Sequence, residues 1–207
     1  MSTAVLILGK SGTGKSASLR NFVPTEVALI QVVKKPLPFK SVGWKPYQTD
    51  NWQQIIAAMR KTQRKVIVID DFQYLLANEY MRRTDETGFT KFTEIGRHAW
   101  EVLTAAAALP DDVRVYILSH TEENDYGQVK MKTIGKMLDE KITLEGLATI
   151  VLRTHIQDGE YQFSTRNNGS DTTKSPIGLF DDTYIPNDLA AVDAAIVDYY
   201  QLINQAA

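Results

Sequence analysis

The stretch GKSGTGKS, residues 9–16, decides the fold, and it directly follows an apolar run from Ala4 to Leu8. It fits the pattern G-x-x-x-x-G-K-[ST] without a gap, and a buried strand that leads into a glycine-rich loop is typical of a phosphate-binding site. Gly12 and Gly14 let the backbone turn its N–H groups toward phosphate oxygens. A helix that we expect to begin near Lys15 would add its positive end. The stretch therefore predicts a nucleoside triphosphatase.

Each polar residue of the loop has an expected role. Lys15 would reach the β- and γ-phosphates, and the Ser16 hydroxyl would hold Mg²⁺. The alternative interpretation is a Gly/Ser-rich turn that matches the pattern by accident. The residues predicted to bind the nucleotide are Gly9, Lys10, Ser11, Gly12, Thr13, Gly14, Lys15, Ser16 and Ala17.

Two further buried strands are predicted to end in polar residues. Val66 to Ile69 precedes Asp70 and Asp71, which is the Walker B arrangement, with Asp70 preferred as the second Mg²⁺ ligand. Val113 to Leu118 precedes Ser119 and His120, and His120 is the candidate sensor of the γ-phosphate, or else a structural histidine. The predicted catalytic residues are Lys15, Asp70, Asp71 and His120.

Composition bounds the class of protein. The chain has 207 residues, 43% of them hydrophobic, which suits one globular domain over residues 1–207. It has no cysteine, and no apolar run approaches the ~20 residues of a membrane span. The N-terminus lacks the pattern of a signal peptide, so we expect a cytoplasmic protein without a membrane partner.

Charge is uneven along the chain although the net charge is only −2. Residues 31–65 contain eight basic side chains and one acid, and residues 175–207 contain five acids and no Lys or Arg. This asymmetry fits a nucleic-acid-binding face, head-to-tail assembly, or two solvated faces. Phe39, Trp44 and Tyr47 lie among the lysines, where they would either stack on bases or pin the loop to the core.

Strand and helix patterns alternate along the chain, which predicts an α/β fold with a mainly parallel sheet and helices on both faces. A second strand is expected over 27–33. Asp158-Gly159 is a hairpin signal that predicts an antiparallel extension near the C-terminus. The predicted helices cover 15–22, 50–61 with Asp50 as N-cap, 72–83, 89–108, and a last helix capped by Asn187 or Asp188.

The set ILGKSGTGKS, VIVIDDF, ILSH, STRNN, TTKSPIGLF and PNDL resembles the phage-encoded AAA-family nucleotide-binding proteins. That family is similar to the RecA/RadA recombinase core and includes the single-strand annealing ATPases of phage recombination. The resemblance implies a RecA-like P-loop fold, ATP and Mg²⁺ as ligands, Asp70 as the Walker B acid and His120 as sensor. It also implies that Lys174 or Arg166 contacts nucleotide from an adjoining subunit of a homo-oligomer.

One departure from the family pattern concerns the catalytic base. RecA-like enzymes usually place a glutamate where this chain has Lys34 and Lys35, and a lysine cannot polarise water as a carboxylate does. Either Asp71 or Glu79 substitutes, or hydrolysis is slow.

The first functional hypothesis is an ATPase that acts on single-stranded DNA in recombination, annealing or replication. The alternative is a helicase-loader-like ATPase that remodels a replication or recombination protein, with little direct DNA binding. Phosphotransfer to a small molecule is disfavoured because no Arg-rich lid is visible. GTP specificity is disfavoured because the N-K-x-D motif is absent.

Overall fold

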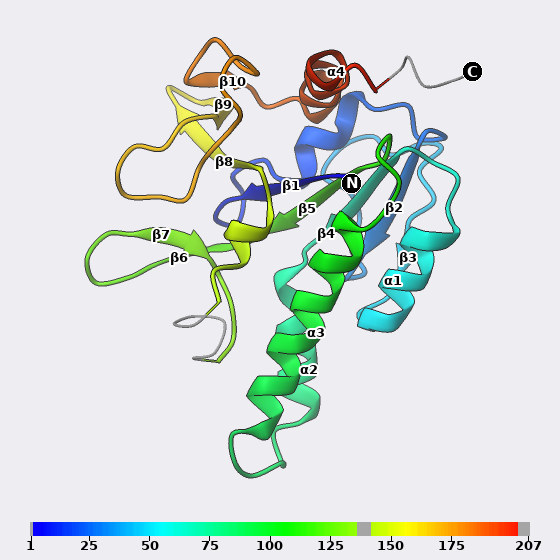
Figure 1. The fold of residues 1–207 in the computed structure, drawn as a ribbon, viewed down its shortest axis with the longest axis vertical. Helices are drawn as coiled ribbons and strands as arrows, with labels where there is room; N and C mark the ends of the chain where they lie inside the picture. Colours follow the sequence, from blue (N-terminus) through cyan, green and yellow to red (C-terminus); the bar gives the residue numbers. More distant parts are fainter. Residues whose placement is uncertain (1, 136–141, 203–207) are drawn as a thin grey trace.

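The computed structural model describes residues 2–135 and 142–202 (Figure 1). The strands are β1 (Thr3–Leu8), β2 (Val27–Gln31), β3 (Tyr47–Gln48), β4 (Val66–Asp70), β5 (Arg114–Ser119), β6 (Thr121–Glu123), β7 (Val129–Met131), β8 (Ile150–Gln157), β9 (Glu160–Ser164) and β10 (Tyr184–Pro186). The α-helices are α1 (Trp52–Lys61), α2 (Gln73–Arg82), α3 (Thr90–Ala107) and α4 (Leu189–Tyr200). Among the described residues, the short 3₁₀ helices are η1 (Ser16–Asn21) and η3 (Leu144–Leu147).

Within the described residues, the strands form one eight-stranded sheet in the order β10-β9-β8-β1-β5-β4-β2-β3 and a separate β6-β7 pair. Every neighbouring pair from β8 to β3 is parallel. The β8–β9 and β9–β10 pairs are antiparallel. The predicted α/β class is therefore confirmed, with a mostly parallel sheet and an antiparallel extension at one edge.

Helices cover both faces of the large sheet. One face packs against α1, α2 and α3, and the other packs against η1 and α4 (Figure 1). Strands β4 and β5 are buried along their whole length, as parallel strands between two helix layers are. Each fully buried aliphatic side chain of these strands contributes roughly 1.5–3 kcal/mol to stability.

The antiparallel extension begins at the predicted hairpin. Asp158 and Gly159 both have positive φ, at 54° and 82°, which is the backbone that a two-residue type I′ turn requires. This turn joins β8 to β9, and β10 then adds to the outer side of β9. The turn therefore confirms the hairpin signal in the sequence.

The predicted helix after the phosphate loop is a 3₁₀ helix of six residues rather than an α-helix. Ser18 N–H is shared between the carbonyls of Gly14 and Lys15, and the chain leaves the helix at Phe22, shortly before Pro24. A 3₁₀ helix of six residues has only a small helix dipole. The positive end that we expected behind the phosphates is therefore weak, and binding there has to rest on the loop itself.

Asp50 is not the N-cap of α1, so that prediction was wrong by one residue. The Asn51 side chain accepts the hydrogen bond from Gln54 N–H at 3.0 Å and caps the helix. Asp50 instead forms an ion pair with Arg82 of α2 at 2.6 Å and accepts from Asn78. Both Asp and Asn are good N-cap residues. Because Asp50 is paired with Arg82 of α2, Asn51 takes the cap position.

Helix α4 is capped at its N-terminus and is tied to the sheet in its first half. Asp188 caps it by accepting from Ala190 N–H and Ala191 N–H, as predicted for this position. One turn further, Asp193 accepts two hydrogen bonds from Arg114 at 2.8 and 2.9 Å and one from the Tyr116 hydroxyl at 2.6 Å. The helix is thereby tied to β5, the strand next to β1.

From the sequence alone, the acidic residues 122–127 and the lysines that follow them, Lys130, Lys132 and Lys136, fit either a DNA-facing loop or a surface hairpin. In the structure, the segment from Thr121 to Met131 forms the β6–β7 hairpin. Lys136, which belonged to the same basic group in the sequence, lies outside the described residues. Among residues 2–135 and 142–202, none of the helices has the length and apolarity needed to cross a membrane.

Candidate nucleotide-binding site

The Gly9–Ser16 loop joins the carboxyl end of β1 to η1. Gly14 has φ of +98°, and a Cβ there would lie 2.9 Å from the Tyr161 ring. Gly9 has an ordinary φ, but a Cβ would lie 1.8 Å from Thr154 Oγ1 of β8. Gly14 is therefore required by its backbone conformation, and Gly9 is required by the close approach of β8.

Lys15 is folded back into its own loop. Its Nζ donates to the carbonyl oxygens of Gly9 at 2.8 Å and Lys10 at 2.9 Å, and the residue is only 5% exposed. Burial lowers the pKa of Lys15 to about 8, although Asp71 and Asp70 act in the opposite direction. An arriving phosphate would favour the charged ammonium, so this lysine is poised to gain a proton when an anion binds.

Ser16 and Asp70 are in direct contact. The Ser16 hydroxyl donates to Asp70 Oδ1 at 2.9 Å, while the buried Asp70 Oδ2 has no hydrogen-bond partner. Asp70 is 1% exposed, and burial together with the neighbouring Asp71 raises its pKa to about 6. A carboxylate with an unused oxygen beside a hydroxyl is a suitable donor set for Mg²⁺, so these residues fit the expected metal.

A metal in this position would need few protein ligands, since Mg²⁺ keeps several waters and takes phosphate oxygens. Within the part of the chain that the structure describes, no group of three or more His, Cys, Asp or Glu side chains could hold a metal by itself.

Asp71 is the most constrained residue of the site. It has a φ of +62°, an unusual conformation for a residue with a side chain, and it is buried. Its Oδ2 lies 2.5 Å from Lys35 Nζ, and its Oδ1 lies 3.8 Å from His120 Nε2. Burial opposes ionisation of Asp71, but His120 and Lys35 outweigh burial and lower its pKa. The carboxylate is therefore ionised and paired.

His120 directly follows β5, and β5 lies between β1 and β4 in the sheet. Since these strands are parallel, the loop after β1, His120 after β5 and Asp71 after β4 meet at one edge. The ring of His120 also packs edge-on against Tyr74, with ring centroids 5.9 Å apart. His120 is thus placed between the phosphate loop and the acidic pair.

These groups surround a cleft of about 440 Å³. The predicted site residues that line it are Ser11, Gly12, Gly14, Lys15, Ser16, Ala17, Asp71 and His120. Asp70 lies in contact with Ser16. Lys10 points to Glu123 of β6, with Nζ and Oε2 3.3 Å apart, and the Thr13 hydroxyl contacts Thr154.

The cleft has lining residues that the sequence did not identify as site residues. Lys35, Pro36 and Pro38 come from the connection after β2, and Tyr161 comes from β9. Lys35 was noted only as a departure from the family pattern, and its pairing with Asp71 depends on two distant strands coming together. For Tyr161, the hairpin signal predicted the strand but not its position beside the loop.

Several other candidates lie elsewhere. Glu79, which was proposed as a substitute base, is hydrogen-bonded to His98 and forms an ion pair with Arg83, where α2 packs against α3. The sequence also offers Arg82 and Arg83 as an arginine finger toward a neighbouring subunit's phosphate, or as solvated arginines. Arg82 is paired with Asp50, and Arg83 is paired with glutamates 79, 86 and 94, so neither matches a free arginine finger. Lys174 forms a backbone bridge to Val151, and Arg166 donates to the carbonyl of Asp181.

The basic segment 31–65 does not form one continuous surface. Lys35 pairs with Asp71, and Lys65 pairs with Asp112 at 2.5 Å. Phe39 and Trp44 pack edge to face at 5.7 Å and lie against the core, which is the loop-pinning alternative. Three further cations of this segment line a groove.

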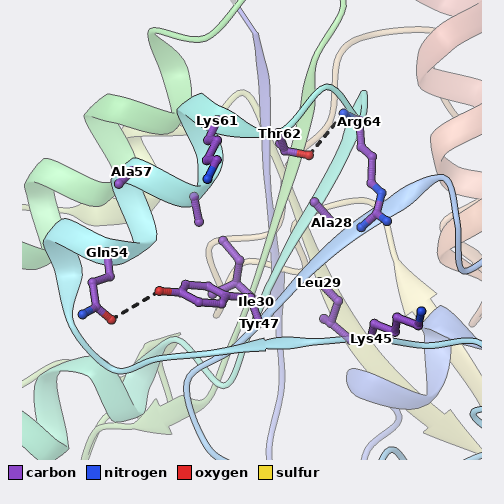
Figure 2. A pocket seen from close by; sticks show the side chains of 11 residues that line it. Ala28, Leu29, Ile30, Lys45, Tyr47, Gln54, Ala57, Lys61, Thr62 and Arg64 are labelled. Carbon is purple, nitrogen blue, oxygen red and sulfur yellow. Dashed lines mark hydrogen bonds between the residues drawn. The ribbon is translucent and has the colours of Figure 1, made fainter.

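A groove beside β2 holds three of these cations. Lys45, Lys61 and Arg64 line it, around an apolar floor of Ala28, Leu29, Ile30, Ala57 and Ala58 (Figure 2). Tyr47 lies across it, with its hydroxyl donating to Gln54 at 3.4 Å. The groove has a volume of about 430 Å³, and its lining includes no carboxylate.

Comparison with known proteins adds no relative: no protein-family model matches the sequence, and the search of curated proteins returned no match. The assignment of the site therefore depends on its residues and geometry.

Proposed function

We propose that this protein is a P-loop ATPase that binds ATP with Mg²⁺ in the cleft beside Lys15. The observation that carries this is the contact between the Ser16 hydroxyl and Asp70 Oδ1 at 2.9 Å, with Asp70 Oδ2 left without a partner. A loop of the G-x-x-x-x-G-K-[ST] pattern and a strand-end carboxylate, 54 residues apart in sequence, meet as a phosphate-and-metal site requires.

Each residue of the site has a proposed role. The loop N–H groups and Lys15 would hold phosphate oxygens, and Ser16 with Asp70 would hold the metal. Mg²⁺, when bound, supplies positive charge that stabilises charge on the phosphates. His120 lies where it would meet the terminal phosphate. Because the Ser16 hydroxyl is the donor to Asp70 Oδ1, both lone pairs of its oxygen stay available, so it could face the metal while it keeps this hydrogen bond.

Slow hydrolysis is part of the proposal. Asp71 is the carboxylate in the cleft that is best placed to accept a proton, but it is paired with Lys35 and has a lowered pKa. A carboxylate stabilised as the anion is a weak general base. Unless the Lys35–Asp71 pair opens, the protein would bind ATP well and hydrolyse it slowly.

The RecA-like and phage-recombination parts of the proposal are supported by the sequence resemblance, and the mostly parallel sheet is compatible with them only at the level of the α/β class. We propose assembly into a homo-oligomer with nucleotide at the subunit interface on the same basis. Lys174 and Arg166 are the residues that the resemblance assigns to a neighbour's nucleotide.

Single-stranded DNA is the partner that we propose, and the groove of Figure 2 is the surface that supports it. Three cations around an apolar floor with a half-exposed tyrosine could pair with phosphates and accept bases.

One observation favours the second candidate, a helicase-loader-like ATPase acting on a protein. Phe39 and Trp44, the other aromatics of this segment, pack against the core and against each other, so they are poorly placed to stack on DNA bases.

The test is ATP hydrolysis with and without single-stranded DNA, at two salt concentrations. Variants are Lys15→Ala for the nucleotide site and Lys45→Ala/Lys61→Ala for the groove. The proposal predicts DNA stimulation that is absent in Lys15→Ala and weakened by salt and by the groove variant. Hydrolysis that is lost in Lys15→Ala but insensitive to DNA would favour the protein-remodelling candidate. Equal hydrolysis by wild type and Lys15→Ala would contradict the ATPase assignment.

A further inference from the structure

Tyr161 lines the nucleotide cleft from the side opposite the acidic pair. In the sheet, β5 and β4 lie on one side of β1 and bring His120, Asp70 and Asp71, whereas β8 and β9 lie on the other side. Tyr161 belongs to β9. The phosphate loop thus has a polar, metal-binding side and an aromatic side.

The Tyr161 ring lies directly against the loop. A Cβ on Gly14 would approach its Cδ1 to 2.9 Å, so the glycine leaves room for the ring. The residue is nevertheless 50% exposed. An aromatic ring that touches the loop on one side and remains accessible on another is suited to hold a flat ligand group against the protein.

The backbone of Tyr161 is fixed by both neighbours. It pairs with Ile156 of β8, and its carbonyl accepts from Asn187 N–H at 3.1 Å, just before the α4 cap. Asn187 is itself held, because Arg20 of η1 donates to its carbonyl oxygen at 2.6 Å. The ring position is therefore set by the sheet and by the segment that enters α4, not by a free loop.

We infer that Tyr161 is the stacking surface for the nucleobase. This inference rests on the proposed function and deepens it. A nucleoside triphosphate whose terminal phosphates face Asp71 and His120 must extend its nucleoside the other way across the loop. The aromatic residue that lines the cleft on that side is Tyr161. Stacking uses the face that every base has, so this subsite favours nucleotides over bare polyphosphate and discriminates weakly between bases.

The experiment compares two ligands, Mg·ATP and Mg·tripolyphosphate, by isothermal titration calorimetry. Tripolyphosphate occupies the phosphate loop but has no base. The variants are Tyr161→Ala and Tyr161→Phe. The matched control is Tyr184→Ala, because Tyr184 is a half-exposed tyrosine of the neighbouring strand β10 that stacks on His155 and does not line the cleft.

Tyr161→Ala should weaken Mg·ATP binding about tenfold, as loss of one base–aromatic stack does, and leave tripolyphosphate affinity within about twofold. Tyr161→Phe and Tyr184→Ala should bind both ligands like wild type. Unchanged ATP affinity in Tyr161→Ala would overturn this inference but leave the proposed function intact. Equal loss of both ligands would also overturn it, since the ring would then serve the loop. Failure of the wild type to bind either ligand would refute the proposed function itself.

Discussion

Asp70→Asn should stabilise the metal-free protein while removing Mg²⁺ binding. Asp70 is buried, its Oδ2 has no partner, and burial with the adjacent Asp71 raises its pKa from 3.8 to about 6. A shift of about two units corresponds to about 3 kcal/mol at 1.36 kcal/mol per unit. This is the cost of holding the ionised carboxylate in the native state, and the amide avoids it.

The pH dependence follows from the direction of the shift. Since the native pKa of Asp70 is raised, the wild type is favoured at low pH and loses stability as pH rises through about 6. The difference in unfolding free energy between Asp70→Asn and wild type should therefore be near zero at pH 4. It should grow to about 3 kcal/mol in favour of the variant above pH 7.

The assay is urea unfolding in EDTA between pH 4 and pH 8, repeated with excess Mg²⁺ and ATP, which should stabilise the wild type alone. The matched control is Asp50→Asn. Burial opposes ionisation of Asp50, but hydrogen bonds from Arg82 and Asn78 lower its pKa, so this control should lose stability above pH 4. An Asp70→Asn variant that is less stable than wild type at pH 8 in EDTA would refute the reasoning.

Two further changes test the packing that positions the site. Asp193→Ala would leave Arg114 and the Tyr116 hydroxyl buried without their partner, so urea unfolding should show a loss of roughly 3–5 kcal/mol; a loss below 1 kcal/mol would contradict a buried ion pair. Asn51→Ala should cost about 1 kcal/mol in the same assay because Gln54 N–H loses its acceptor, and an unchanged midpoint would mean that Asn51 is not the cap.

The sequence predicted the strands that are buried on both faces, because their aliphatic runs leave few alternatives. Strands β1, β4 and β5, with the residues that follow them, are where the pattern indicated. The hairpin at Asp158-Gly159 was equally local, since positive φ at two successive residues is a property of those residue types.

What the sequence missed depends on tertiary partners. Choosing Asn51 over Asp50 as a cap depends on Arg82, which is far along the chain. The Lys35–Asp71 pair and the position of Tyr161 depend on which strands become neighbours, and single-sequence periodicity carries no information about strand order. The basic segment looked continuous in sequence, but Lys35 and Lys65 form ion pairs, whereas Lys45, Lys61 and Arg64 line the groove.

The central claim is that Lys15 and the loop around it bind the phosphates of ATP. The most direct test is calorimetric titration of Mg·ATP at pH 8 in two buffers of different ionisation enthalpy, with wild type and Lys15→Ala. Because the pKa of Lys15 is about 8, about half of the molecules have a neutral Lys15 amine at pH 8, and anion binding should add up to about half a proton per protein to this amine. Asp70, with a pKa of about 6, is already ionised at that pH. Binding with proton uptake in wild type, and neither in Lys15→Ala, is the predicted result. Mg·ATP binding that is equally tight in Lys15→Ala, or absent from the wild type, would contradict the claim.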